Sequence, residues 1–157
     1  MKIREIEQKD KPWIERLLTK HWSSPKIISR GKIHWANKLP GFIAESGQKR
    51  IGLVTYKIEN NECEIVTLNS EVQKKGVGTL LVEKTKETAR GKNCKRVWVV
   101  TTNDNLNALR FYQKRDFHLV KVHRNALDLS RKLKPEIPKI GLNGIALRDE
   151  IELEHKL

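Results

Sequence analysis

The sequence predicts one α/β domain over residues 1–157, in which a mixed, mostly antiparallel twisted sheet of about seven strands is flanked by helices. Three observations lead to this prediction. Three strand-like runs follow one another across tight turns, which favours antiparallel pairing. A glycine-bearing turn and an apolar helical stripe come directly after the third run. A chain of this length is typical of a single domain that buries a sizeable core.

The region before the glycine turn predicts one helix and four strands. Asp10 can cap a helix, Pro12 suits its first turn, and an apolar stripe continues to about Trp22. Residues 26–40 predict no regular element, because a glycine and a proline interrupt the apolar run. The expected strands are 2–7, 41–46, 51–59 and 62–69, with the second and third joined as a hairpin.

The region after the turn predicts two further helices and three strands. The first helix ends at Gly91, a common helix stop, and Thr102 or Asp104 could cap the second. The last two strands are expected to pair with each other, because one is basic and the other alternates apolar with acidic residues. The expected helices are 76–90 and 105–114, and the expected strands are 96–102, 117–123 and 149–154.

Residues 124–148 lie between those last two strands and are too many for a hairpin turn. We expect a short helix at 126–133, followed by a loop with prolines and glycines. An insertion of this size is a candidate lid over a binding site, or else a simple surface excursion.

The glycine turn is suited to holding a phosphate. The first turn of a helix has backbone N–H groups without partners, and it lies at the positive end of the helix dipole. Gly76 and Gly78 have no Cβ, so an anion can approach these N–H groups closely. Lys74 and Lys75 add positive charge. The alternative is a plain glycine turn with solvated lysines.

Two motifs identify the family that the chain resembles. Gln73-x-x-Gly76-x-Gly78 resembles the signature with which GNAT N-acetyltransferases grip the pyrophosphate of acetyl-CoA. A Walker loop would need a lysine before Thr79, and a dinucleotide fingerprint would need a glycine in place of Leu81. The second motif, Asn105-x-x-Ala108-x-x-Phe111-Tyr112 followed by Phe117, is similar to a segment of the same family.

The resemblance implies a GNAT fold with acetyl-CoA in the splay between the strands 62–69 and 96–102. The backbone around Leu68 would pair with the pantetheine arm, and an N–H there would stabilise the oxyanion. Asn105 would contact the cofactor arm. The residues expected to bind the cofactor are Leu68, Gln73, Lys74, Lys75, Gly76, Val77, Gly78, Thr79, Asn105, Ala108 and Phe111.

Acetyl transfer to an amine also needs an acid for the leaving thiolate. Tyr112 is the expected acid, because a phenol with an ordinary pKa of about 10 carries a proton at neutral pH. Members of the family often use a tyrosine at this place. The alternative is that Tyr112 is a core aromatic residue beside Phe111.

The amine must lose a proton, and Glu64 is the expected base, either directly or through a water. A carboxylate in a β-branched strand is out of place in a plain core. The alternative is an outward-facing salt-bridge residue. Glu62 shares the same strand face and is the second candidate, and His118 and His123 are weaker ones.

The chain departs from the family pattern at two positions. Ser70 replaces a common proline, and Asp116 replaces the usual glycine before Phe117. That glycine often adopts a positive φ, which Asp tolerates better than most residues. The segment between the first two strands of the family usually borders the acceptor. The residues placed near that border are Trp22, Arg30, His34 and Trp35.

Composition narrows the class of protein further. The net charge is +13, from 32 basic and 19 acidic residues, which suits a polyanionic cofactor and a lysine-rich surface. The basic residues are scattered, which disfavours a nucleic-acid partner. Cys63 and Cys94 form no metal-binding pattern, so we expect buried thiols and no metal. No apolar run approaches the roughly 18 residues of a membrane span, and no signal segment opens the chain.

We therefore expect a cytoplasmic N-acetyltransferase without a membrane partner, which transfers the acetyl group of acetyl-CoA directly to an amine of a small molecule or peptide. A homodimer is left open. The alternative functions are a non-catalytic acyl-CoA-binding sensor and a basic RNA- or ribosome-binding module.

Overall fold

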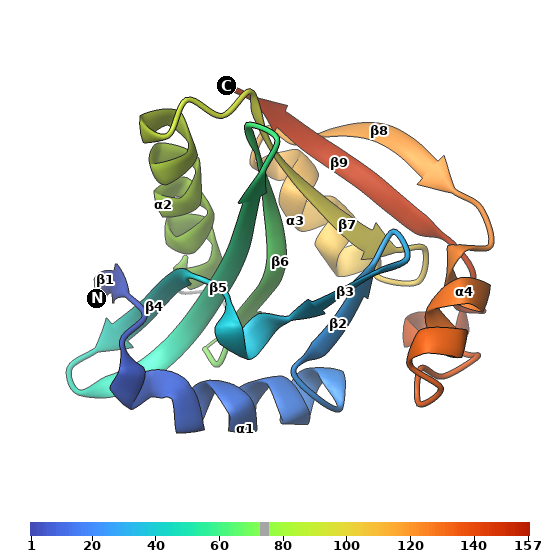
Figure 1. The fold of residues 1–157 in the computed structure, drawn as a ribbon, viewed down its shortest axis with the longest axis horizontal. Helices are drawn as coiled ribbons and strands as arrows, with labels where there is room; N and C mark the ends of the chain where they lie inside the picture. Colours follow the sequence, from blue (N-terminus) through green and yellow to red (C-terminus); the bar gives the residue numbers. More distant parts are fainter. Residues whose placement is uncertain (73–75) are drawn as a thin grey trace.

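The computed structural model describes residues 1–72 and 76–157. Figure 1 traces the elements in chain order. The helices are α1 (Lys11–Trp22), α2 (Val77–Gly91), α3 (Leu106–Lys114) and α4 (Ala126–Leu133), with short 3-10 turns η1 (Gln8–Asp10), η2 (Ala36–Lys38) and η3 (Leu142–Gly144). The strands are β1 (Lys2–Glu5), β2 (Lys26–Ser29), β3 (Lys32–Trp35), β4 (Gly41–Ser46), β5 (Lys49–Glu59), β6 (Glu62–Ser70), β7 (Arg96–Thr102), β8 (His118–His123) and β9 (Glu150–Lys156).

Seven strands form one sheet in the order β1-β4-β5-β6-β7-β9-β8. The pairing of β6 with β7 is parallel, and the other pairings in this sheet are antiparallel. The predicted mixed, mostly antiparallel sheet is therefore confirmed, as is the pairing of the two strands that flank the insertion.

The two parallel strands separate part of the way along their length. Their pairing runs from Glu62 with Arg96 to Ile65 with Val99, and the sheet register continues no further between them. On its other edge β6 stays paired with β5, but a bulge leaves Val66 without a partner. A bulge bends its strand and increases the local twist. The second half of β6 thus turns away from β7, which opens the expected splay.

The sheet carries an apolar core on each face. Ile65 and Cys63 of β6 pack with α2 and α3 residues, among them Leu81 and Tyr112. The opposite face packs against α1, which contributes Ile14, Leu17 and Leu18. Because side chains alternate along a strand, Glu62 and Glu64 point to this second face.

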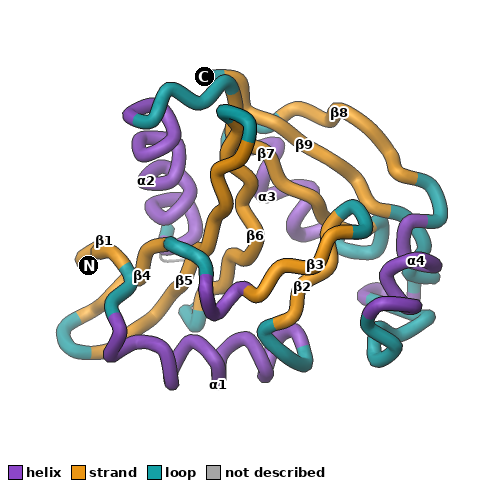
Figure 2. The backbone as a smooth tube through the Cα atoms, viewed as in Figure 1, coloured by secondary structure: helices purple, strands orange, loops and turns teal. Residues whose placement is uncertain are grey.

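Residues 26–40, for which no element was expected, form a two-stranded hairpin of their own. Figure 2 shows it as a short pair of strands separate from the main sheet. Arg30 and Gly31 both adopt positive φ angles, of 52° and 74°, as a tight turn of the favoured hairpin type requires. A glycine that interrupts an apolar run therefore marks a strand reversal here.

Two predicted helix caps are wrong. Asp10 precedes α1, but its side chain makes no cap hydrogen bond and instead accepts from the guanidinium groups of Arg4 and Arg50. The α3 helix is capped by Asn105, whose side-chain oxygen accepts from the backbone N–H of Ala108 at 3.1 Å. A buried carboxylate is more stable beside an arginine than at a helix end, since it must be paired.

The substitution of Asp for glycine before Phe117 has the expected consequence. Asp116 adopts a φ of 66°, so the chain still reverses into β8. Within residues 1–72 and 76–157, no helix combines the length and the apolarity that a membrane crossing needs.

Candidate active site

A cleft of about 630 Å³ lies where the second half of β6 meets the start of α2 and the inner side of α3. We call it the α2–α3 cleft. Eight residues predicted to act at the site line it: Leu68, Gly76, Val77, Gly78, Thr79, Ala108, Phe111 and Tyr112. Gln73, Lys74 and Lys75, also predicted to bind the cofactor, lie outside the described residues. Asn105 caps α3 and is not among the lining residues; Asn107 is.

Glycines set the shape of the cleft's α2 end. Gly76 has a φ of 71°, which L side chains rarely adopt, and turns the chain into the helix. A Cβ on Gly78 would lie 3.1 Å from the Phe111 ring, so this glycine lets α2 approach α3 closely. The first turn of α2, with its free N–H groups, therefore borders the cleft.

Arg115 is a cleft residue that the sequence analysis missed. Its Nε donates to the Thr79 hydroxyl at 2.8 Å, and its Nη1 donates to the carbonyl oxygen of Phe111 at 2.9 Å. The guanidinium carbon stacks 3.9 Å from the centre of the Phe111 ring. These contacts hold a positive charge beside the α2 N-terminus. The four-residue spacing from Phe111 was the available signal, because it places both on one helix face.

Tyr112 lies between two aromatic rings at the inner end of the cleft. Its ring meets Phe111 and Phe117 edge to face, at centroid distances of 5.1 and 5.2 Å. Its side chain is 6% exposed, and burial raises the pKa of the phenol. The hydroxyl therefore keeps its proton at neutral pH. Tyr112 belongs both to the core and to the cleft, so the two readings of its role are compatible.

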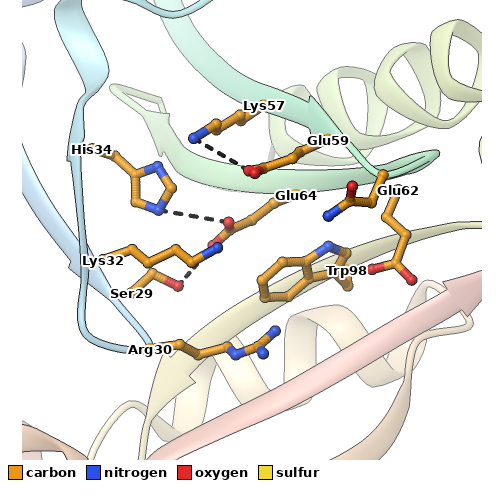
Figure 3. A pocket seen from close by; sticks show the side chains of 10 residues that line it. Ser29, Arg30, Lys32, His34, Lys57, Glu59, Glu62, Glu64 and Trp98 are labelled. Atoms are coloured by element: carbon orange, nitrogen blue, oxygen red, sulfur yellow. Dashed lines mark hydrogen bonds and ion pairs between the residues drawn. The ribbon is translucent and has the colours of Figure 1, made fainter.

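A second cavity, of about 160 Å³, lies on the opposite face of β6 beneath the β2–β3 hairpin. We call it the Glu64 cavity. Figure 3 shows side chains from β3, β5, β6 and β7 pointing into it. The lining residues are Ser29, Arg30, Lys32, His34, Lys57, Glu59, Asn60, Glu62, Glu64 and Trp98.

Glu64 is 6% exposed and is held from two sides. The Ser29 hydroxyl donates to its Oε2 at 2.7 Å, and His34 Nε2 lies 3.6 Å from its Oε1. Burial raises the pKa of Glu64 to about 7, against the hydrogen bond from Ser29 and the charges of Arg30 and Lys57. The carboxyl is thus poised to exchange a proton near neutral pH.

His34 is buried and electrically neutral. Burial, followed by the charge of Lys57, lowers its pKa, so its contact with Glu64 is not an ion pair. Its Nε2 has no hydrogen-bond partner within the described residues. A buried polar atom without a partner is costly, and here it faces a cavity.

The other residues considered for catalysis or for the acceptor are distributed differently. Arg30 and His34 line the Glu64 cavity, whereas Trp22 lines another cavity and Trp35 is half exposed. Glu62, the second candidate base, pairs with Arg96 at 3.1 Å. His118 is exposed, and His123 lies 3.1 Å from Glu152.

The insertion 124–148 forms a wall of that other cavity, of about 230 Å³, together with the end of α1 and β2. Lys134 Nζ donates to the carbonyl oxygen of Lys26 at 2.6 Å. The Asp104 carboxylate accepts from the backbone N–H of Leu142 at 2.7 Å. A Cβ on Gly31 would lie 2.9 Å from Leu129 of α4. The segment is packed against the hairpin, and its opening as a lid stays a prediction.

The cleft and the Glu64 cavity lie on opposite faces of β6 at the point where the splay begins. Leu68 packs toward α2 and α3, and Glu64 points to the hairpin face. Glu64 is paired with Trp98, one position before the last pair between β6 and β7. A group that reaches through the splay from the cleft would therefore arrive next to Glu64.

Both cysteines are buried, and burial raises the pKa of Cys63 to about 12. Neither thiol has the character of a nucleophile. Outside residues 73–75, no group of three or more His, Cys, Asp and Glu side chains is arranged to hold a metal ion.

Comparison with known proteins agrees with this geometry. The model of the acetyltransferase (GNAT) family matches residues 2–117. The chain is 45% identical to uncharacterized protein YdhI of Bacillus subtilis strain 168 over 84% of its length and 83% of the relative's. It is 40% identical to uncharacterized protein YxbD of the same strain, over 96% of this chain and 95% of the relative.

Two solved structures share the fold along 99% of both chains. The IAA acetyltransferase from Bacillus cereus ATCC 14579 has a TM-score of 0.74 and 23% identity. A Bacillus subtilis acetyltransferase solved in complex with CoA has a TM-score of 0.71 and 21% identity. These likenesses confirm the expected fold.

Proposed function

The chain belongs to the acetyltransferase (GNAT) family, and we propose that it transfers the acetyl group of acetyl-CoA directly to an amine of a small molecule or peptide. One observation carries the proposal. A buried carboxyl with a pKa of about 7, Glu64, lies across β6 from a cleft that contains a protonated phenol, Tyr112. Direct transfer needs a base and an acid on the two sides of one thioester.

The α2–α3 cleft suits the parts of CoA. Free N–H groups at the start of α2 and the Arg115 guanidinium would hold the pyrophosphate. The half of β6 that has left β7 offers backbone groups to the amides of the pantetheine, as a strand edge does to a peptide. When bound, acetyl-CoA supplies an acetyl group activated as a thioester.

In the proposed reaction Glu64 takes the proton of the acceptor ammonium, directly or through a water. The freed amine forms the new C–N bond as the C–S bond breaks. A backbone N–H near Leu68 stabilises the negative oxygen that develops on the acetyl group. Tyr112 gives its proton to the departing sulfur, so the products are an amide and CoA.

The test is thiol release from acetyl-CoA over a panel of amines, with CoA binding measured by calorimetry in parallel. We expect release with at least one amine, and release at least 100-fold slower in Glu64→Gln with CoA affinity unchanged. Tight CoA binding without release for any amine would instead support the acyl-CoA sensor.

A further inference from the structure

The Glu64 cavity is lined by three cationic and three acidic side chains, and most of them are already paired. The pairs are Arg30 with Glu152 at 3.6 Å, Lys57 with Glu59 at 3.4 Å and Glu62 with Arg96 at 3.1 Å. Arg30 also stacks 5.0 Å from the Trp98 ring. These groups can shape the cavity, but their charges are largely compensated by neighbours.

Two charged groups are left over, Lys32 and Glu64. No carboxylate within the described residues lies within 4.0 Å of the Lys32 ammonium. Figure 3 shows the Lys32 side chain extending from β3 toward the same space that Glu64 faces from β6. The cavity thus offers one uncompensated cation, one proton-accepting carboxyl and the unpartnered Nε2 of His34.

A ligand that satisfies all three groups carries a cationic amine and an anion close together. The volume of about 160 Å³ admits a molecule of amino-acid size and no large one. A polyamine would bring a second positive charge toward Lys32, and like charges in a partly buried site repel. An acceptor without an anion would leave the Lys32 charge and the His34 nitrogen uncompensated.

We propose that the acceptor is a small amine that carries its own anionic group, such as a free amino acid. Lys32 binds the anion, His34 Nε2 takes part in a hydrogen bond to the same molecule, and Glu64 accepts the proton of its ammonium. This inference rests on the proposed acetyl transfer, and it names the chemical class of the acceptor. A carboxylate and a phosphonate would meet the same requirement.

The test compares four acceptor preparations by thiol release from acetyl-CoA. They are a mixture of the twenty L-amino acids, a mixture of the corresponding amino-acid amides, 2-aminoethylphosphonate and spermidine. We expect release with the amino acids or the phosphonate, which tells the two anions apart, and at least tenfold slower release with the amides and spermidine.

The second arm removes the uncompensated cation. Lys32 is exposed, so Lys32→Gln and Lys32→Glu should fold normally. Loss of a charge-assisted contact should raise KM for the anionic acceptor about 10- to 100-fold and change kcat less than threefold. Lys32→Glu should also narrow the preference against amides. Lys38→Gln, an exposed lysine on the same connection outside the cavity, should leave both constants unchanged.

Two outcomes would overturn the inference, and they differ in what else they affect. Faster release with amides or spermidine than with either anionic preparation, or an unchanged KM in Lys32→Glu, would refute the acceptor class and leave acetyl transfer intact. No release with any preparation, in a protein that binds acetyl-CoA, would refute amine acetylation and the acceptor class together.

Discussion

The Ser29 hydroxyl donates a 2.7 Å hydrogen bond to Glu64 Oε2, which joins the β2–β3 hairpin to the strand that borders the splay. The hairpin thereby both buries the carboxyl and partly compensates for its burial. Burial raises the pKa of Glu64 to about 7, and the Ser29 bond acts in the opposite direction. The balance of the two sets the pH at which this carboxyl can act as a base.

The pH profile should report this balance. Because the base must be ionised, kcat/KM should rise with pH and level off above about 7. Ser29→Ala removes a bond that favours the ionised form, so the inflection should move to higher pH. Glu64→Gln should lower kcat about 10²- to 10⁴-fold and remove the inflection. An unshifted inflection in Ser29→Ala would mean that another group titrates.

Glu64 should also cost stability at high pH. Its pKa in the folded protein is raised from the ordinary 4.5 to about 7, so its stabilising effect is present below 4.5 and is lost as the pH rises through about 7. Glu64→Gln should therefore be more stable than the wild type at pH 8, by about 1–3 kcal/mol, and close to it at pH 4. Urea unfolding at the two pH values measures this. A mutant that is less stable at pH 8 would contradict a desolvated carboxylate.

Tyr112→Phe keeps the ring between Phe111 and Phe117 and removes only the hydroxyl. If that hydroxyl protonates the thiolate, kcat should fall about 10²- to 10⁴-fold with little change in KM or CoA affinity. Tyr56→Phe is the matched control, since Tyr56 is a buried tyrosine of the same core that stacks on Phe42 and does not line the cleft. Wild-type turnover in Tyr112→Phe would leave Tyr112 a packing residue.

Gly76→Asp should abolish CoA binding, because a carboxylate would meet the pyrophosphate at the N–H groups that hold it. Gly47→Asp is a close control. Both glycines have positive φ, of 71° and 63°, and neither Cβ would meet another atom within 4 Å. Gly47 lies in the β4–β5 turn, so this variant should carry the same backbone strain and bind CoA normally. Equal affinities measured by calorimetry would contradict the phosphate site.

Arg115→Ala should weaken CoA binding about tenfold, because it removes a cation from the cleft. Arg110→Ala, at an exposed position of the same helix, should leave the affinity unchanged. The difference should shrink as salt is added, since partly exposed charges are screened. A loss that does not depend on salt would point to a packing role for Arg115 beside Phe111.

Local patterns in the sequence were sufficient for most of the fold. The strands β4 to β7, the helices α2 to α4 and the pairing of β8 with β9 lie within two residues of their predicted bounds. Each has strong periodicity and a clear glycine, asparagine or proline boundary. The β2–β3 hairpin was missed, because four-residue strands carry too little periodicity to register. The caps of α1 and α3 were missed because competing hydrogen-bond partners lie far away in the chain.

The sequence by itself determined which chemistry the chain carries: a glycine turn before a helix, a tyrosine in a family motif and a carboxylate in a β-branched strand. These are local features, and the local residues suffice to recognise them. Only the tertiary structure decided that Ser29, His34 and Lys32 surround Glu64, and that Arg115 lies beside Thr79. A pKa depends on burial and on charges within a few ångströms, and those neighbours come from segments about 30 residues apart in the chain. The reactivity of Glu64 is therefore a property of the packed fold.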